Sequence, residues 1–191
     1  MHRFYDPNIA TTLQLSEEES KHCVRVLRLT EGDEIEVVDG AGNLYLCKIA
    51  MAHPKRCGVE IVEHKECPPH WGHQIVLCVA PTKNLDRMED MADRVTEMGV
   101  DRIIPLLCRN SERKVLKTDR IQKILVSAMK QSLKAQLPQL DELTPFKQLM
   151  QMPFEGNKYI AYCDMMLPRE QLCVLSKEYR PGTCLLYTSP S

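Results

Sequence analysis

The sequence predicts an α/β protein of two domains, a small β-barrel followed by a parallel sheet covered by helices. Short runs of alternating polar and apolar residues, spaced about ten residues apart, indicate the barrel within residues 1–70. Continuous apolar runs that alternate with helical patterns indicate the second domain, over residues 73–183. Between them, "HKECPPHWGH" contains two prolines and a glycine, which mark a linker.

The first domain is expected to contain one helix and several strands. "SEEESKHCVRVLRL" opens with a capping box, in which Ser16 caps the helix and Glu19 lies three residues further on. "EGDEIEVVDGAGNLYLCKIA" then predicts a hairpin whose turn is "DGAG", and "CGVEIVEH" predicts another strand. The apolar positions expected on these strands are Ile35, Val37, Leu44, Leu46, Ile49, Val59 and Ile61.

The second domain is expected to alternate strands and helices. The strands are "QIVLCVA", "DRIIPLLC" and "KYIAYC", and the helices are "NLDRMEDMADRVTEMG", which stops at Gly99, and residues 118–134. The apolar stripes of the two helices are Met88, Met91, Ala92, Val95 and Met98, and Ile121, Ile124, Leu125 and Ala128. Such alternation is typical of a parallel sheet with helices on its faces.

The composition excludes several classes of protein. Hydrophobic residues make up 43% and charged residues 27% of the chain, as in ordinary globular proteins. No apolar run reaches the roughly 18–20 residues of a membrane span, and "MHRFYDPNIA" lacks the apolar core of a secretory signal. The nine cysteines form no C-x-x-C pair, which favours free thiols in a reducing cytoplasm.

Positive charge is concentrated in residues 109–134, which hold eight Lys or Arg against two acids, although the chain as a whole carries −1. Arg109 directly follows a predicted strand, and ligands of open α/β sheets bind at that edge. Arg109, Ser111 and Arg113 could bind phosphate oxygens or base carbonyls. The segment contains no aromatic residue, so recognition of an RNA backbone and shape is favoured over base stacking. A solvated helix face is the alternative.

The linker contains four residues of zinc-ligand type at every third position, His64, Cys67, His70 and His73. Structural zinc sites usually join two separated pairs of ligands, and the two prolines prevent a helix that would align these residues. A histidine-rich linker without a metal is therefore the favoured interpretation.

The segment "APTKNLDRMED" follows the first buried strand, where a dinucleotide-binding protein would carry a glycine-rich loop. It contains no glycine, so that fingerprint is absent. Lys83 and Arg87 lie there instead, either as RNA contacts or as part of a solvated loop and helix start.

Several blocks of the sequence, in order, resemble the 16S ribosomal RNA uridine-N3 methyltransferase family, whose members are SPOUT (trefoil-knot) methyltransferases. The blocks are "MHRFY", "HCVRVLRLTEGDEIEVVDGAG", "APTKNLDRMEDMADRVTEMGVDRIIPLLCRNSERKV" and "ILVSAMKQSLKAQLPQL". The resemblance implies a PUA-like RNA-binding barrel at residues 1–70, followed by an incomplete SPOUT domain at 73–183. It further implies S-adenosylmethionine as cofactor, 16S rRNA of the small ribosomal subunit as substrate and a cytoplasmic homodimer that binds neither DNA nor membrane.

The resemblance also implies roles for individual residues. The substrate-facing motifs of the family fall on Arg3, Arg25, Arg28, Arg109, Ser111, Gln131, Ser132 and Lys134. Arg109 would stabilise the negative charge that develops on the uracil during methylation, and Tyr162 and Cys163 would contact the cofactor. After its Gln–Ser pair the family usually has Gly–Arg, whereas this chain has Leu133–Lys134, which keeps a cation but loses the planar guanidinium.

The end of the chain departs from the family. The family continues into a Gly-Pro-Glu-Gly-Gly loop that holds the methyl donor, whereas this chain ends in "YRPGTCLLYTSPS". Residues 184–191 resemble translated adapter sequence, although "TCLLY" could fill one strand position. We therefore expect this chain to be a truncated form that does not bind the donor or methylate RNA by itself.

Methylation of uridine N3 in 16S rRNA is the predicted function of the parent protein. Two alternatives remain open. One is a non-enzymatic RNA-binding protein with a PUA-like barrel, and the other is a SPOUT methyltransferase that acts on transfer RNA. Binding of S-adenosylmethionine by a complete chain would separate the first alternative from the predicted enzyme.

Overall fold

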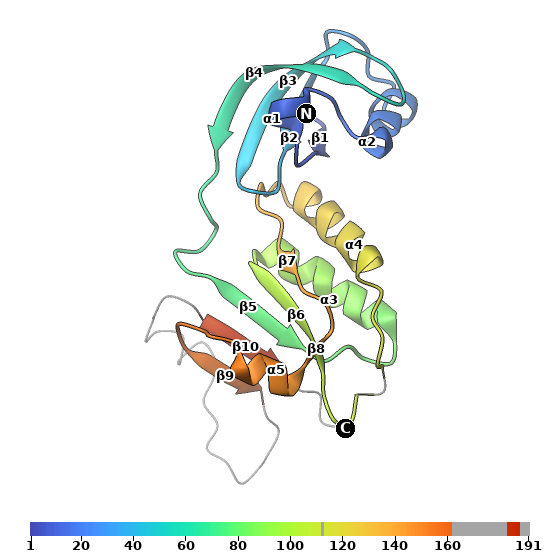
Figure 1. The fold of residues 1–191 in the computed structure, drawn as a ribbon. Helices are drawn as coiled ribbons and strands as arrows, with labels where there is room; N and C mark the ends of the chain where they lie inside the picture. Colours follow the sequence, from blue (N-terminus) through green and yellow to red (C-terminus); the bar gives the residue numbers. More distant parts are fainter. Residues whose placement is uncertain (112, 162–182, 188–191) are drawn as a thin grey trace. The chain divides into compact units, whose positions relative to one another are not determined.

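The computed structural model describes residues 1–111, 113–161 and 183–187. Two compact units make up the chain (Figure 1). Unit 1 contains Met1–Pro69 and Val126–Leu137, and unit 2 contains His70–Leu125 and the residues from Pro138 onward. The chain thus leaves the first unit where the sequence predicts a boundary, near residue 70. Its return to that unit at Val126 was not predicted.

Unit 1 is built on a four-stranded sheet. Its strands are β1 (Arg3–Tyr5), β2 (Glu34–Val38), β3 (Asn43–Met51) and β4 (Gly58–Glu66). They pair in the order β1-β2-β3-β4, parallel between β1 and β2 and antiparallel elsewhere. The predicted hairpin is therefore confirmed. In the part of the chain that the structure describes, no ladder joins β1 to β4, so the closure expected of a barrel is not observed.

The helical part of unit 1 consists of α1 (Ile9–Thr12), α2 (Glu17–Lys21) and the π-helical turn η1 (His22–Val26). The Ser16 hydroxyl accepts a hydrogen bond from the Glu19 backbone N–H at 3.3 Å, as the sequence predicts. The reciprocal half of the capping box is replaced, because the Ser16 N–H donates to the Asp6 carboxylate at 2.8 Å. Because the Ser16 N–H bonds Asp6, the Glu19 side chain can pair with another group.

The apolar residues of β3 divide between the two faces of the sheet. Tyr45, Cys47 and Ile49 point into the core, whereas Leu44 packs on the other face of the sheet with Val38 and Met129. Successive side chains of a strand alternate between faces, so Leu44 and Leu46 cannot share a face with Ile49. Burial of Cys47 raises the pKa of its thiol to about 11, which keeps it protonated at neutral pH.

The segment that follows α4 packs against the turn between β2 and β3. Leu137 donates its N–H to the Gly40 carbonyl at 2.8 Å, and Gly42 donates to the Ala135 carbonyl at 3.1 Å. Both glycines are left-handed, with φ of +80° and +104°. A Cβ on Gly40 would lie 3.0 Å from a ring carbon of Tyr5 and 3.1 Å from the Leu137 Cβ. The two glycines therefore permit both the turn and the docking.

Unit 2 is built on a parallel sheet in the order β7-β6-β5-β10-β9, with β8 paired to β6 (Figure 1). The strands are β5 (Ile75–Val79), β6 (Arg102–Leu107), β7 (Gln139–Leu140), β8 (Thr144–Pro145), β9 (Lys158–Ala161) and β10 (Thr183–Tyr187). The predicted parallel sheet is confirmed, and "TCLLY" fills a strand position between β5 and β9. Residues 162–182, between β9 and β10, lie outside the described part, and the trefoil knot that the resemblance implies stays a prediction.

Three helices accompany this sheet, namely α3 (Leu85–Met98), α4 (Thr118–Gln131) and α5 (Phe146–Gln151). Asn84 caps α3 by accepting from the Asp86 N–H, and Gly99 ends the helix with φ of +88°. Met88 and Ala92 are buried as predicted, but Met98 is 66% exposed, so its assignment to the apolar stripe was wrong. The helix ends there, and the following residues turn toward β6.

The helix α4 starts in unit 2 and ends in unit 1. It is shorter than the predicted helix over residues 118–134, because Leu133 adopts a left-handed conformation with φ of +58°. In the described residues, no helix is long and apolar enough to cross a membrane.

Replacement of Gly40 by alanine tests the packing of the segment after α4 against the β2–β3 turn. We expect a loss of about 2–4 kcal/mol in the free energy of unfolding, from backbone strain and from overlap with Tyr5 and Leu137. Gly32 is the matched control, since it is also left-handed but has nothing within 4 Å of a Cβ, and Gly32→Ala should cost only about 1–2 kcal/mol. Equal losses in chemical denaturation would contradict the account of the turn.

Candidate functional site

The strand-edge loops of unit 2, residues 80–84 and 108–117, hold four of the predicted site residues, namely Lys83, Arg109, Ser111 and Arg113. They leave the carboxyl ends of β5 and β6, which are adjacent and parallel. Because the ends of parallel strands meet at one edge of a sheet, both loops lie where open α/β sheets bind ligands. Arg109 therefore occupies the predicted position. Glu112 lies outside the described residues.

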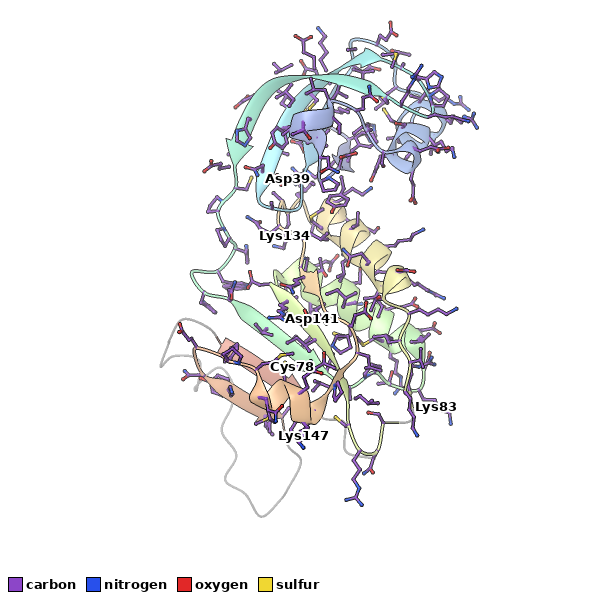
Figure 2. All side chains as sticks on the ribbon, in the orientation of Figure 1. Asp39, Cys78, Lys83, Lys134, Asp141 and Lys147 are labelled. Atoms are coloured by element: carbon purple, nitrogen blue, oxygen red, sulfur yellow. The ribbon has the colours of Figure 1, made fainter. Side chains whose placement is uncertain are left out.

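The two loops enclose a basic hollow. Lys83, Arg113, Lys114 and Val115 line an open hollow of about 700 Å³ (Figure 2 labels Lys83). One terminal nitrogen of Arg113 donates to the Lys83 carbonyl at 2.9 Å and so joins the two loops. The Nε of Arg113 is buried and has no hydrogen-bond partner among the described residues. The described residues that line the hollow include three cations, so the hollow suits an anion.

Arg109 and Ser111 play different parts in the second loop. The Ser111 hydroxyl accepts a hydrogen bond from the Cys108 N–H at 2.9 Å, and the Ser111 N–H donates to the Cys108 carbonyl at 3.1 Å. These bonds close a tight turn, so Ser111 shapes the loop. Arg109 is exposed inside that turn. The loop thus presents a guanidinium at the edge of the sheet.

The helices α3 and α4, next to these loops, offer fewer unpaired cations than the sequence suggests. Arg120 on α4 pairs with Glu89 on α3 at 2.7 Å, which neutralises one of the predicted cations. Arg87 lies in the first turn of α3 and is exposed. The cations of the strand-edge loops therefore dominate this end of unit 2.

A second group of predicted residues belongs to unit 1. Arg25 on η1 and Arg28 just after it are exposed, and Arg28 is left-handed with φ of +57°. Gln131 is exposed at the end of α4, and Lys134 follows it (Figure 2). The Ser132 hydroxyl donates to the Ala128 carbonyl at 2.7 Å and is used within the helix end.

Arg3 differs from the other predicted contacts, because it is committed inside unit 1. Its guanidinium donates to the Glu36 carboxylate at 2.7 and 2.9 Å and to the Lys134 carbonyl at 3.5 Å. Its side chain is only 10% exposed. The structure therefore gives Arg3 a part in holding β1 and the segment after α4 to β2, and leaves little of it for an RNA contact.

Sequence reasoning missed the pairing of Glu19 with Lys130. The Lys130 ammonium lies 2.5 Å from one Glu19 oxygen, and Glu19 is 8% exposed. Its other oxygen is buried without a hydrogen-bond partner among the described residues. The pair ties the end of α4 to α2. In the sequence, Glu19 looks like an acid that interacts with the dipole of its own helix, because it lies in the first helical turn. Nothing in the sequence identifies a partner 111 positions away.

A cavity of about 300 Å³ lies between the sheet of unit 2 and the segment around α5. Its polar rim lies at the amino ends of the strands, away from the strand-edge loops, and includes Arg102 and Lys158. Arg102 binds Asp141 through two hydrogen bonds of 2.9 and 2.6 Å, which raise the pKa of Arg102 (Figure 2 labels Asp141). These bonds hold β6 to the segment that follows β7.

His64 and His70, two of the linker residues of zinc-ligand type, contact neighbouring side chains. His64 lies in β4, stacks on Tyr45 with ring centroids 4.9 Å apart and hydrogen-bonds Asn43. His70 meets Trp71 edge-on at 4.6 Å. Within residues 1–111, 113–161 and 183–187, no group of three or more His, Cys, Asp or Glu is arranged to hold a metal ion. The predicted cofactor contacts Tyr162 and Cys163 lie outside these residues.

Two family models match the chain. Residues 69–186 match an RNA methyltransferase domain, and residues 15–62 match an RNA methyltransferase PUA domain. The two matches correspond in order to the two domains that the sequence predicts.

The chain is similar to curated proteins called ribosomal RNA small subunit methyltransferase E. The Aquifex aeolicus protein is 28% identical over 94% of this chain and 72% of its own length. The Synechocystis protein is 28% identical over 95% of this chain and 60% of its own length. The chain thus spans between 60% and 72% of the length of these relatives.

Solved structures are also similar. A probable rRNA methyltransferase from Porphyromonas gingivalis is 30% identical, with a TM-score of 0.87 over 98% of this chain and 79% of that one. A ribosomal RNA small subunit methyltransferase E from Neisseria gonorrhoeae, bound to S-adenosylmethionine, shares the fold at 22% identity. Its TM-score is 0.84, over all of this chain and 79% of that one.

Replacement of Lys130 by methionine tests the buried ion pair. It leaves the Glu19 carboxylate uncompensated in a largely buried site, and we expect the free energy of unfolding to fall by about 3 kcal/mol. Adding Glu19→Gln should recover part of this loss.

The exposed pair of Lys21 with Glu17, at 2.7 Å, provides the control. Lys21→Met should cost less than about 1 kcal/mol, as exposed ion pairs do. A Lys130→Met variant as stable as Lys21→Met would contradict the role given to Lys130.

Proposed function

The chain belongs to the RNA methyltransferase family that matches its residues 69–186, and we propose that the protein methylates N3 of a uridine in 16S ribosomal RNA with S-adenosylmethionine as donor. The names of the curated relatives support a small-subunit RNA as substrate. The observation that carries the proposal is the basic hollow at the carboxyl ends of β5 and β6.

The charge of the hollow favours RNA as its occupant. Lys83, Arg113 and Lys114 provide three cations around an open space, which suits successive phosphates of a polyanion better than an enclosed small acid. The methyl donor is a sulfonium cation, and the same charges disfavour it there. We therefore assign the hollow to the RNA backbone.

Unit 1 supports the same substrate class through Arg25 and Arg28. Both are exposed, and each can contact phosphate or a base edge. Residues 109–134 contain no aromatic side chain, which favours recognition of backbone and shape over stacking of the RRM kind. RNA is thus proposed to contact both units, each through its own cationic group.

Arg109 is the proposed catalytic residue. Methylation at N3 requires loss of the uracil N3–H proton, after which negative charge spreads over N3 and the two carbonyl oxygens. A guanidinium hydrogen-bonded to those atoms stabilises the transition state more than the neutral ground state. Arg109 is exposed in a tight turn at the edge of the sheet, where such a base could approach it.

S-adenosylmethionine supplies the electrophilic methyl group of this reaction. We propose Tyr162 and Cys163, which directly follow β9, as the donor contacts that this chain carries. The similar structure from Neisseria gonorrhoeae is bound to S-adenosylmethionine, which supports the identity of the donor. We also propose that the protein acts as a homodimer in the cytoplasm.

Two alternatives remain, and donor binding and substrate choice separate them. A non-enzymatic RNA-binding protein would bind small-subunit RNA without binding S-adenosylmethionine, even when completed to the length of its relatives. A transfer RNA methyltransferase would label transfer RNA in preference to small subunits. The matched RNA methyltransferase domain favours the enzymatic function over the first alternative.

The double variant Arg109→Ala/Arg113→Ala tests RNA binding at the strand-edge loops. Affinity for 16S RNA should fall, and the slope of log affinity against log salt should decrease by about 2, because two phosphate or base contacts are lost. The charge-matched control is Arg94→Ala/Lys147→Ala, which removes exposed cations from α3 and α5. A wild-type affinity unchanged between about 50 and 200 mM salt would contradict the proposal.

Methyl transfer tests the reaction. Undermethylated small subunits and labelled S-adenosylmethionine are incubated with this chain and with a chain completed to the length of its relatives. We expect N3-methyluridine from the completed chain, and a decrease in kcat of about 100-fold on Arg109→Ala in that chain, with a smaller change in KM. Full activity of Arg109→Ala would remove Arg109 from the reaction, and label in another base or in transfer RNA would refute the assigned substrate.

A further inference from the structure

Leu133 occupies a backbone position that favours glycine. The Lys134 N–H donates to the Met129 carbonyl at 3.0 Å, and the Leu133 N–H donates to the Lys130 carbonyl at 3.3 Å. These two bonds form a Schellman motif at the end of α4, with Leu133 at the left-handed position, where φ is +58°. A leucine there is strained by contact between its Cβ and its own backbone, whereas glycine is not.

The chain on both sides of Leu133 is fixed, so the strain cannot relax. On the helix side, the ion pair of Lys130 with Glu19 holds the last turn of α4. On the other side, Arg3 reaches the Lys134 carbonyl at 3.5 Å, and the Ala135 carbonyl accepts from Gly42. A strained conformation persists when its surroundings determine it in this way.

Folding of unit 1 does not explain the leucine side chain. Leu133 is 68% exposed and belongs to no hydrophobic core cluster of the described residues. It lies between Ser132 and Lys134, just after the exposed Gln131. An exposed apolar group held rigidly among polar and cationic groups is suited to contact a ligand with an apolar face and a charged backbone.

We propose that Leu133 is an RNA contact that packs against the face of a nucleobase, while the neighbouring Lys134 meets the adjacent phosphate. This inference rests on the proposed RNA binding and adds a base contact to it. Each nucleobase presents an apolar face whatever its identity, so the contact adds affinity without reading sequence. The strained backbone keeps the side chain exposed and limits the entropy lost on binding.

The Leu133→Gly variant separates binding from folding. Relief of the strain should raise the midpoint of thermal unfolding by about 1–3 °C. Affinity for protein-free 16S RNA should fall about fivefold to tenfold, since an apolar contact is lost. The slope of affinity against salt should not change, because no phosphate contact is lost. Leu133→Met, which keeps an apolar side chain, should retain most of the affinity.

Leu13→Gly is the matched control. Leu13 is also left-handed, with φ of +51°, is 44% exposed and ends a helix of the same unit. We expect this substitution to leave RNA affinity unchanged. Binding of long-chain polyphosphate, which has charge but no bases, should be equal for wild type and Leu133→Gly.

Three outcomes would overturn the inference. Equal affinity of wild type and Leu133→Gly for 16S RNA would refute the base contact alone. A loss seen with intact small subunits but not with protein-free RNA would assign Leu133 to a ribosomal protein instead. Failure of the wild-type chain to bind RNA at all would refute the proposed function together with this inference.

Discussion

Close docking of the segment after α4 against the β2–β3 turn is the constraint on which unit 1 depends. Gly40 and Gly42 make it possible, because any side chain at Gly40 would occupy the space of Tyr5 and Leu137. The docked segment completes a small core that contains Val38, Met129 and Ala135. Without it, Met129 in the last turn of α4 would lose its packing against Val38 and Ala135.

The same docking brings the predicted substrate contacts of unit 1 onto a rigid frame. Gln131 and Lys134 flank the point at which α4 ends, and the Glu19–Lys130 pair fixes that point from the other side. Side chains held by packing and hydrogen bonds lose less freedom on binding than those of a loose loop. The buried ion pair thus contributes to precision of position as well as to stability.

Ion pairing decides which cations of this nearly neutral chain are available to a polyanion. Each of the four cations Arg3, Arg102, Arg120 and Lys130 is paired with an acid, and all four pairs join distant parts of the sequence within one unit. The hollow in unit 2 gathers cations instead, because Lys83, Arg113 and Lys114 are its charged lining among the described residues. A local site for RNA is therefore compatible with an overall charge of −1.

Features with a local cause could be predicted from the sequence. The cap at Ser16, the turn at "DGAG", the stop at Gly99 and the buried run of β5 each follow from a few neighbouring residues. The position of Arg109 at the edge of the sheet follows from its place after a strand. The RNA methyltransferase assignment came from resemblance, since neither periodicity nor charge distinguishes this enzyme from other basic α/β proteins.

Features that depend on distant residues could not be predicted in this way. The return of residues 126–137 to unit 1 depends on the two glycines of the turn, far away in sequence. The resemblance predicts Arg3 as a substrate contact, whereas its pairing with Glu36 is visible only once β1 and β2 are adjacent. The burial of Tyr45 and Cys47 was not predicted, because they do not look more apolar than Leu44 and Leu46, although alternation places them with Ile49.

Ultraviolet cross-linking of the chain to protein-free 16S RNA, followed by mass spectrometry of the cross-linked peptides, tests the central claim most directly. The account predicts cross-links in the peptides that contain residues 109–117 and 131–134, one from each unit. Cross-links concentrated instead in the acidic outer strand β4 or in α5, with none in those two segments, would contradict it.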